Sequence, residues 1–167
     1  MTNQEFVDII DEVKDKMYRL ALRVVHNPTE AEDVVQEVII KVWDKRVYFE
    51  SIENKAGWCM TLTRNLAIDK TRSKHRRTNH IDGYNNLSNN APTPEDILET
   101  SDLLQKVKEL YNKLPEIQRT VLHLRDIEEY SYDEISEITG YTSNQVKINI
   151  YRGRQALKSQ LKILKNA

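Results

Sequence analysis

The feature that most constrains the fold is a break in hydrophobic periodicity near the middle of the chain. On both sides of the break, apolar residues recur every three or four positions, the spacing of a helix with one buried face. Between residues 78 and 100 this periodicity is absent, and the segment holds five asparagines together with Pro92 and Pro94. So long a stretch is unusual inside one compact domain. We therefore expect an all-α protein with two small helical domains, residues 1–77 and 101–167, joined by a flexible linker over 78–100.

The first half should form three helices. Apolar residues spaced between positions 6 and 24 predict a long first helix. We expect Thr29 to cap a second helix, with Glu32 three residues further on in a capping box. A charged and aromatic segment over 44–55 should follow as a loop, and a third helix should run from about residue 56 to residue 77.

The second half carries the pattern of a helix-turn-helix, after two apolar stripes that Pro115 separates. Ser131 and Glu134 form a capping box that should open a short helix, and Thr142 and Gln145 form a second box before a longer final helix. Between the helices, Gly140 is free to take a positive φ. In this layout the second helix enters the major groove of DNA.

The final helix presents a polar face away from its apolar stripe. Asparagine and glutamine pair with adenine, arginine pairs with guanine or phosphate, and Ile148 fits against a thymine methyl group. An ordinary helical hairpin with a basic last helix is the alternative. The residues that we expect to contact DNA are Ser143, Asn144, Gln145, Lys147, Ile148, Asn149, Arg152 and Arg154.

Charge is strongly segregated although the net charge is only −1. Residues 61–80 carry six basic groups and one acidic group, and residues 141–167 carry six basic groups and no acidic one. Two basic patches favour a polyanion contacted at two places, whereas a single charge run is usually a solvated helix face. The second helix instead turns acidic residues outward around Ile40, a surface that suits a protein partner. On composition alone, a solvated face explains that helix equally simply.

Several classes of function lack the residues that they need. The chain has one cysteine, and its four histidines, at positions 26, 75, 80 and 123, form no metal pair. No glycine-rich phosphate loop is present, so we expect neither an enzyme nor a bound cofactor or metal. No apolar run approaches the roughly 20 residues of a membrane span, and the first residues do not form a signal peptide. We expect a cytoplasmic protein.

Both halves resemble bacterial sigma factors. The first half is similar to their core-binding and promoter-melting region through Ala31–Glu37, Lys41-Val42-Trp43, Trp58, Arg64–Asp69 and Arg72. The second half is similar to their C-terminal helix-turn-helix through Leu114-Pro115, Gln118-Arg119, Leu122, Tyr132–Ser136, Gly140, Val146-Lys147, Arg152-Gly153-Arg154 and Leu157. A chain with only these two regions and a linker resembles the extracytoplasmic-function (ECF) group.

The resemblance implies roles that composition could not give. The acidic helix would dock on the clamp helices of core RNA polymerase through Asp33, Gln36, Glu37, Ile40 and Asp44. The segment over 44–55 and the following helix would read and melt the minus-ten promoter element, with a flipped base held by Tyr48, Phe49 or Asn54. The whole minus-ten set would be Tyr48, Phe49, Asn54, Lys55, Trp58, Arg64, Lys70, Arg72, Lys74, Arg76 and Arg77. The final helix would read the minus-thirty-five element, and the acidic linker would run through the polymerase channel toward the RNA exit.

Some residues depart from the family pattern, and these departures put the promoter sequence in doubt. The family commonly has threonine at Gln145, serine at Ile148 and arginine at Asn149. Its usual Arg-Ala-Arg is here interrupted by Gly153, which costs about 1 kcal/mol of helix propensity. Close packing on a neighbouring helix would explain that glycine.

Two further points concern partners. A helical anti-sigma protein would cover the polymerase-docking surface, although the sequence itself carries no evidence of one.

The rival hypothesis is a helix-turn-helix regulator that binds duplex DNA without polymerase, its first half serving as a dimerisation or sensing domain. Reversing the charges of Asp33 and Glu37 separates the two hypotheses, because a regulator would retain its DNA binding.

Overall fold

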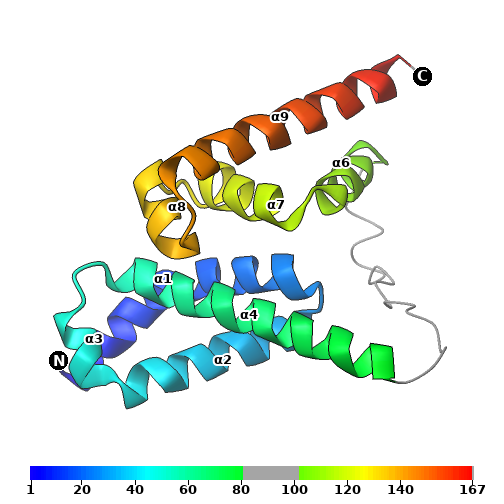
Figure 1. Ribbon diagram of the computed structural model, residues 1–167. Helices are drawn as coiled ribbons and strands as arrows, with labels where there is room; N and C mark the ends of the chain where they lie inside the picture. Colours follow the sequence, from blue (N-terminus) through cyan, green and yellow to red (C-terminus); the bar gives the residue numbers. More distant parts are fainter. Residues whose placement is uncertain (81–101, 167) are drawn as a thin grey trace. The chain divides into compact units, whose positions relative to one another are not determined.

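The computed structural model describes residues 1–80 and 102–166. The described chain is helical, without strands, and falls into two compact units (Figure 1). One unit is built from α1 to α4 and the other from α6 to α9. The all-α, two-domain prediction is therefore confirmed. The predicted linker lies outside the described residues except at its first positions, where α4 continues to His80.

The first unit packs α1 (Asn3–Val25), α2 (Pro28–Asp44) and α4 (Lys55–His80) against one another. The predicted stripe of α1 is buried, and Met17 and Leu20 are fully enclosed. Val34 and Val38 of α2 are also fully buried. The periodicity of the sequence thus identified the core-facing sides of both helices.

Two details of the first unit differ from the sequence predictions. The N-cap of α2 is Asn27 rather than Thr29, because the Asn27 side chain accepts a hydrogen bond from the Glu30 amide at 3.0 Å. Pro28 then occupies the first turn, where its fixed φ suits a helix start. The predicted loop over 44–55 also contains a short helix, α3 (Arg46–Ser51). Its six residues are too few to show a periodicity in the sequence.

The second unit contains α6 (Asp102–Lys113), α7 (Glu116–Leu122), a π-helical turn η1 (His123–Ile127), α8 (Tyr132–Thr139) and α9 (Ser143–Lys165). Both predicted capping boxes are present, and Gly140 ends α8 with a φ of 76°. The helix-turn-helix prediction is therefore confirmed. Nothing in the sequence indicated the π-helical turn, which adds a bulge between α7 and α8.

Candidate nucleic-acid and protein interfaces

The outer face of α2 is polar with one aliphatic group. Asp33, Gln36 and Asp44 are exposed, and the side chain of Ile40 retains 61% of its accessible surface. The buried residues of α2 occupy the opposite side, so this face is free for a partner. An exposed aliphatic residue ringed by polar ones has the composition of a protein contact with a polar rim.

Glu37 has a different environment from the rest of that face. Its Oε2 atom lies 3.2 Å from the Lys70 Nζ atom of α4, and its Oε1 atom lies 3.3 Å from the Nζ atom of Lys41. The hydrogen bond from Lys70 holds the pKa of the Glu37 carboxyl below its ordinary value, and Lys41 adds to this effect. A second bridge joins Lys74 of α4 to Glu30 of α2 at 3.2 Å. Two residues expected to meet DNA are thus paired with α2 carboxylates.

The aromatic residues near α3 separate into buried and exposed groups. Phe49 is completely buried, with its ring centre 5.6 Å from that of Trp58 and 6.2 Å from that of Phe6. The prediction that Phe49 can hold a flipped base is therefore wrong, because the core of the first unit encloses the ring. Tyr48 is 59% exposed and meets half-buried Trp58 edge to face at 5.9 Å. These two rings form the accessible aromatic surface beside α4.

Asn54 and Lys55 have structural contacts at the start of α4. The Oδ1 atom of Asn54 accepts a hydrogen bond from the Gly57 amide at 2.9 Å, which caps the helix. The ammonium group of Lys55 donates to the carbonyl of Ile52 at 2.8 Å. Both side chains therefore fix the junction between α3 and α4, whatever else they contact.

The remaining cations of α4 follow its length. Arg64 is half-buried, whereas Arg72, Arg76 and Arg77 are exposed. The latter three make no ion pair with any residue in 1–80 or 102–166. Their charges are available for a polyanion, unlike those of Lys70 and Lys74.

The start of α9 presents most of the predicted reading face. Ser143, Asn144, Lys147 and Arg152 are exposed, and Ile148 keeps 46% of its surface accessible. An isoleucine so exposed gains nothing in a solvated helix, and it fits a partner with a methyl group.

Two of the predicted reading residues are engaged in the cap of α9 and its first turns. Gln145 is exposed, but its side-chain oxygen accepts a hydrogen bond from the Thr142 amide at 2.9 Å. The Asn149 side chain is half-buried and donates to the Gln145 carbonyl at 2.8 Å.

The guanidinium group of Arg154 pairs with a carboxylate of η1. Its Nη2 and Nε atoms lie 2.5 Å and 3.4 Å from the two carboxylate oxygens of Asp126, and this pairing raises the pKa of Arg154. The sequence could not show this pair, which joins residues 28 positions apart. Arg154 therefore fixes α9 against η1.

The expected close approach at Gly153 is also present. Gly153 is buried where α9 crosses α7, and a Cβ atom built there would lie 2.7 Å from Leu122 Cδ1. Such a separation is shorter than carbon atoms tolerate. The missing side chain is what allows the two helices to meet.

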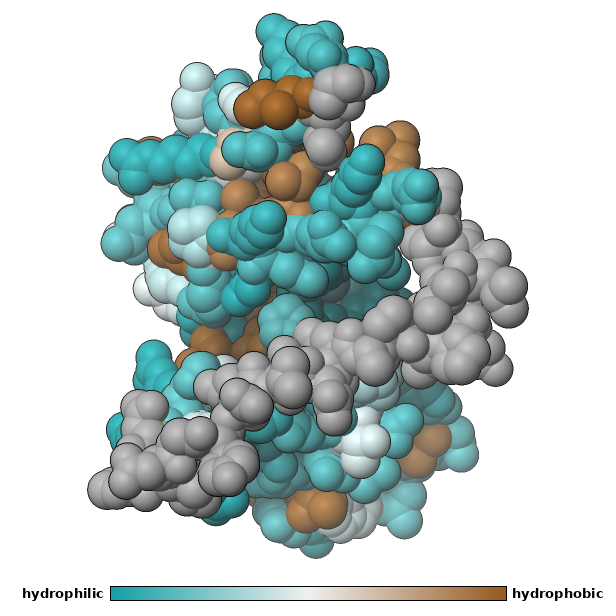
Figure 2. Space-filling model, turned by 90° about the vertical axis from the view of Figure 1, so that its right-hand side faces the viewer, coloured by the Kyte–Doolittle hydropathy of each residue, from teal (hydrophilic) through white to brown (hydrophobic). Residues whose placement is uncertain are grey.

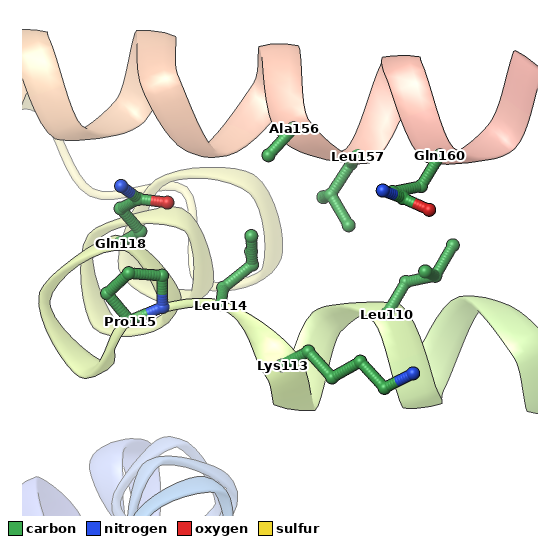
Figure 3. A pocket seen from close by; sticks show the side chains of 8 residues that line it. All are labelled: Leu110, Lys113, Leu114, Pro115, Gln118, Ala156, Leu157 and Gln160. Carbon is green, nitrogen blue, oxygen red and sulfur yellow. The ribbon is translucent and has the colours of Figure 1, made fainter.

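Sequence reasoning missed two hollows between α6 and α9. One holds about 350 Å³, and across it Leu110 and Leu114 point toward Leu157 (Figure 3). The other, of about 830 Å³, has Leu103, Val107 and Leu161 along it. Figure 2 shows hydrophobic side chains gathered among hydrophilic ones in the upper part of the molecule, where the end of α9 lies. The helix α6 buries no residue fully, although its apolar stripe was evident in the sequence.

The described part of the chain offers no group of three side chains able to hold a metal ion. Within residues 1–80 and 102–166, no helix is both long and apolar enough to cross a membrane.

Two family models match the chain, and they match its two units. Residues 9–77 match sigma-70 region 2, and residues 104–157 match sigma-70 region 4. Both regions are those of bacterial sigma factors.

Individual sigma factors also match along nearly all of this chain. The ECF RNA polymerase sigma factor SigW of Bacillus subtilis is 34% identical over 168 residues, with 95% of this chain and 90% of SigW covered. SigE of Mycolicibacterium smegmatis is 33% identical, with 92% of this chain and 60% of SigE covered. Sigma factor RpoE from Bartonella quintana, solved with the anti-sigma factor NepR, shares the fold with a TM-score of 0.77 at 24% identity, covering 96% of this chain and 98% of RpoE.

The chain belongs to the ECF family of RNA polymerase sigma factors, as its sequence motifs predicted. It is an alternative sigma factor, a transcription initiation factor that directs RNA polymerase to promoters.

Proposed function

We propose that the two units of this sigma factor divide promoter recognition between them. The first unit docks on core RNA polymerase and engages the minus-ten element, and the second reads the minus-thirty-five element. The observation that carries this proposal is that one chain holds both an exposed acidic face around Ile40 and the capped, basic helix α9. Two weak DNA contacts joined by one tether reinforce each other.

Docking would use the part of α2 that the fold leaves open. Asp33, Gln36 and Ile40 are accessible on one side of the helix. A cationic partner surface with a small apolar recess would match this face. Asp44, exposed at the end of the same helix, would extend the contact.

Capture of an unstacked minus-ten base would use Tyr48 rather than Phe49. The exposed Tyr48 ring, supported edge-on by Trp58, offers a surface for base stacking. Asn54 would act by holding the start of α4, because its oxygen already caps that helix. Arg72, Arg76 and Arg77 would contact phosphates and set the salt dependence of binding.

Readout of the minus-thirty-five element would centre on the exposed side chains at the start of α9. Asn144, Ile148 and Arg152 would contact base edges or adjacent phosphates, with Lys147 and Ser143 beside them. Gln145, Asn149 and Arg154 already have intramolecular partners, so they would contribute chiefly by holding the helix in place.

Partners and location follow from this role. An anti-sigma protein would bind this chain and block its docking surface, a hypothesis supported by the complexes of RpoE with NepR and of CnrH with the cytosolic domain of CnrY. CnrH shares the fold with a TM-score of 0.68 at 19% identity, covering 97% of this chain and 90% of CnrH. The chain would act in the cytoplasm, where the polymerase works, and would leave catalysis to the polymerase.

The decisive test is binding to purified core RNA polymerase. We expect the wild-type chain to bind and an Asp33→Lys/Ile40→Lys variant to lose most of its affinity, because both side chains lie on the open face of α2. A Val7→Lys/Glu12→Lys variant is the matched control, since it changes an exposed aliphatic residue and an exposed acid on α1. Absence of binding by the folded wild-type chain would contradict the proposal and favour a regulator that acts without polymerase.

A further inference from the structure

Glu37 belongs to two surfaces at once. It lies on α2 beside the open face around Asp33 and Ile40, yet its Oε2 atom forms an ion pair with the Nζ atom of Lys70 on α4, at 3.2 Å. The side chains of Lys70 and Glu37 retain 36% and 42% of their accessible surface, so either can exchange partners without rearranging the core. Glu37 is therefore within reach of a protein bound to α2, and Lys70 is within reach of DNA bound to α4.

The ion pair between Glu37 and Lys70 offsets one positive charge of α4. Arg72, Arg76 and Arg77 present full charges to solvent, whereas the charge of Lys70 is offset by the carboxylate beside it. A phosphate that approaches Lys70 must compete with Glu37. Because exposed ion pairs are individually weak, this competition can be decided by a binding partner.

We propose that Glu37 is a shared group that couples the two surfaces: in the free protein it neutralises Lys70 and weakens DNA binding, and docking of a cationic protein surface on α2 withdraws it and releases Lys70 to bind a phosphate. The proposal rests on the proposed function, which assigns α2 to polymerase and α4 to DNA. Coupling of this kind is reciprocal. DNA bound at Lys70 should therefore strengthen the docking of polymerase. Removal of Lys70 should have the same effect, because it too frees Glu37 from its partner on α4.

The first experiment measures DNA binding by the free full-length chain. The probe is a fluorescein-labelled DNA duplex of random sequence, followed by anisotropy over a range of NaCl concentrations. Glu37→Gln should raise the affinity about two- to fivefold, the range expected for one exposed ion pair. It should also steepen the dependence of log K on log salt by about 0.9, because one more cation meets a phosphate.

The matched control is Glu32→Gln, which removes the same charge from an exposed position of α2. Glu32 has no ion pair with any described residue. The Glu37→Gln effect should exceed that of Glu32→Gln and should disappear in a Lys70→Gln background. Equal effects of the two glutamine variants, or an effect that survives in the Lys70→Gln background, would overturn the proposal, since either result would reflect net charge alone.

The second experiment measures affinity for core RNA polymerase in the absence of DNA. Lys70→Gln should bind about two- to fivefold more tightly than the wild-type chain. Lys45→Gln, which removes an exposed cation from the same unit, should show no such gain. If the wild-type chain binds polymerase but Lys70→Gln and Lys45→Gln behave alike, the shared role of Glu37 is wrong while the proposed function stands. If the wild-type chain does not bind polymerase, the proposed function fails. The DNA experiment still tests whether Glu37 weakens DNA binding through its ion pair with Lys70.

Discussion

The contact at Gly153 gives a prediction in which two effects of opposite sign compete. Replacing a helical glycine by alanine normally stabilises a protein, because alanine favours the helix by about 1 kcal/mol. At this position the new methyl group would lie 2.7 Å from Leu122 Cδ1 and 3.3 Å from Leu122 Cγ. Leu122 is 1% exposed, so it has little room to move away. Overpacking of this kind typically costs about 1–3 kcal/mol.

The balance of these effects is a net loss. We expect Gly153→Ala to lower the free energy of unfolding of the second unit by about 1 kcal/mol, the middle of the range that the two effects allow. Leu122→Val removes the carbon atom that makes the shortest contact, at a cost of about 1 kcal/mol by itself. In that background Gly153→Ala should become neutral or stabilising. The reversal of sign is the signature of a steric cause.

The assay must report on the second unit alone. Both tryptophans, Trp43 and Trp58, lie in the first unit, so the midpoint of tryptophan fluorescence during denaturation should not change. Amide hydrogen exchange of buried positions such as Ile150 measures the stability of the helices that meet at Gly153. Stabilisation of the wild-type background by Gly153→Ala would refute the argument, because it would show that α7 and α9 can accept a side chain between them.

Three further predictions test other parts of the structure. Cys59 is fully buried, and burial raises the pKa of its thiol to about 12, so the native protein at pH 8 should react with a disulfide reagent at least about 1,000 times more slowly than the protein in guanidinium; rapid reaction of the native state would contradict this. Ser131→Ala should destabilise the second unit by about 1 kcal/mol in the same exchange assay, because its hydroxyl caps α8, whereas Ser131→Asp should retain the cap. Lys70 holds the pKa of Glu37 below the ordinary value of 4.5, so the bridge stabilises the fold above that pH and is lost as the pH falls through the lowered pKa. An NMR titration should show the Glu37 pKa rising toward 4.5 in Lys70→Gln, and an unchanged titration would exclude the bridge.

Several short-range features of this protein were predictable from its sequence, although the cap of α2, Asn27 instead of Thr29, was not. The capping boxes at Ser131 and Thr142 and the positive φ of Gly140 involve residues within a few positions of each other. The buried stripes of α1 and α2 follow from helical periodicity in the same way. Exposure of Ile40 and Ile148 follows as well, because each lies opposite its helix's apolar stripe.

Features that depend on one helix meeting another were not predictable. The rings of Phe6 and Trp58 enclose Phe49, which distinguishes it from its neighbour Tyr48 although both are aromatic residues in one short segment. Arg154 looked like one more cation on a basic helix until η1 placed Asp126 beside it.

Apart from the short α3 and the π-helical turn η1, the sequence by itself therefore determined the helices, their inward and outward faces, the two-part organisation and the family. Only the tertiary structure decided which of the outward charges are available to a partner and which aromatic ring remains exposed. The physical reason is distance along the chain: caps and stripes depend on neighbours three or four residues away, whereas the bridge from Lys74 to Glu30 joins residues 44 positions apart. Such a contact exists only after α2 and α4 have packed together.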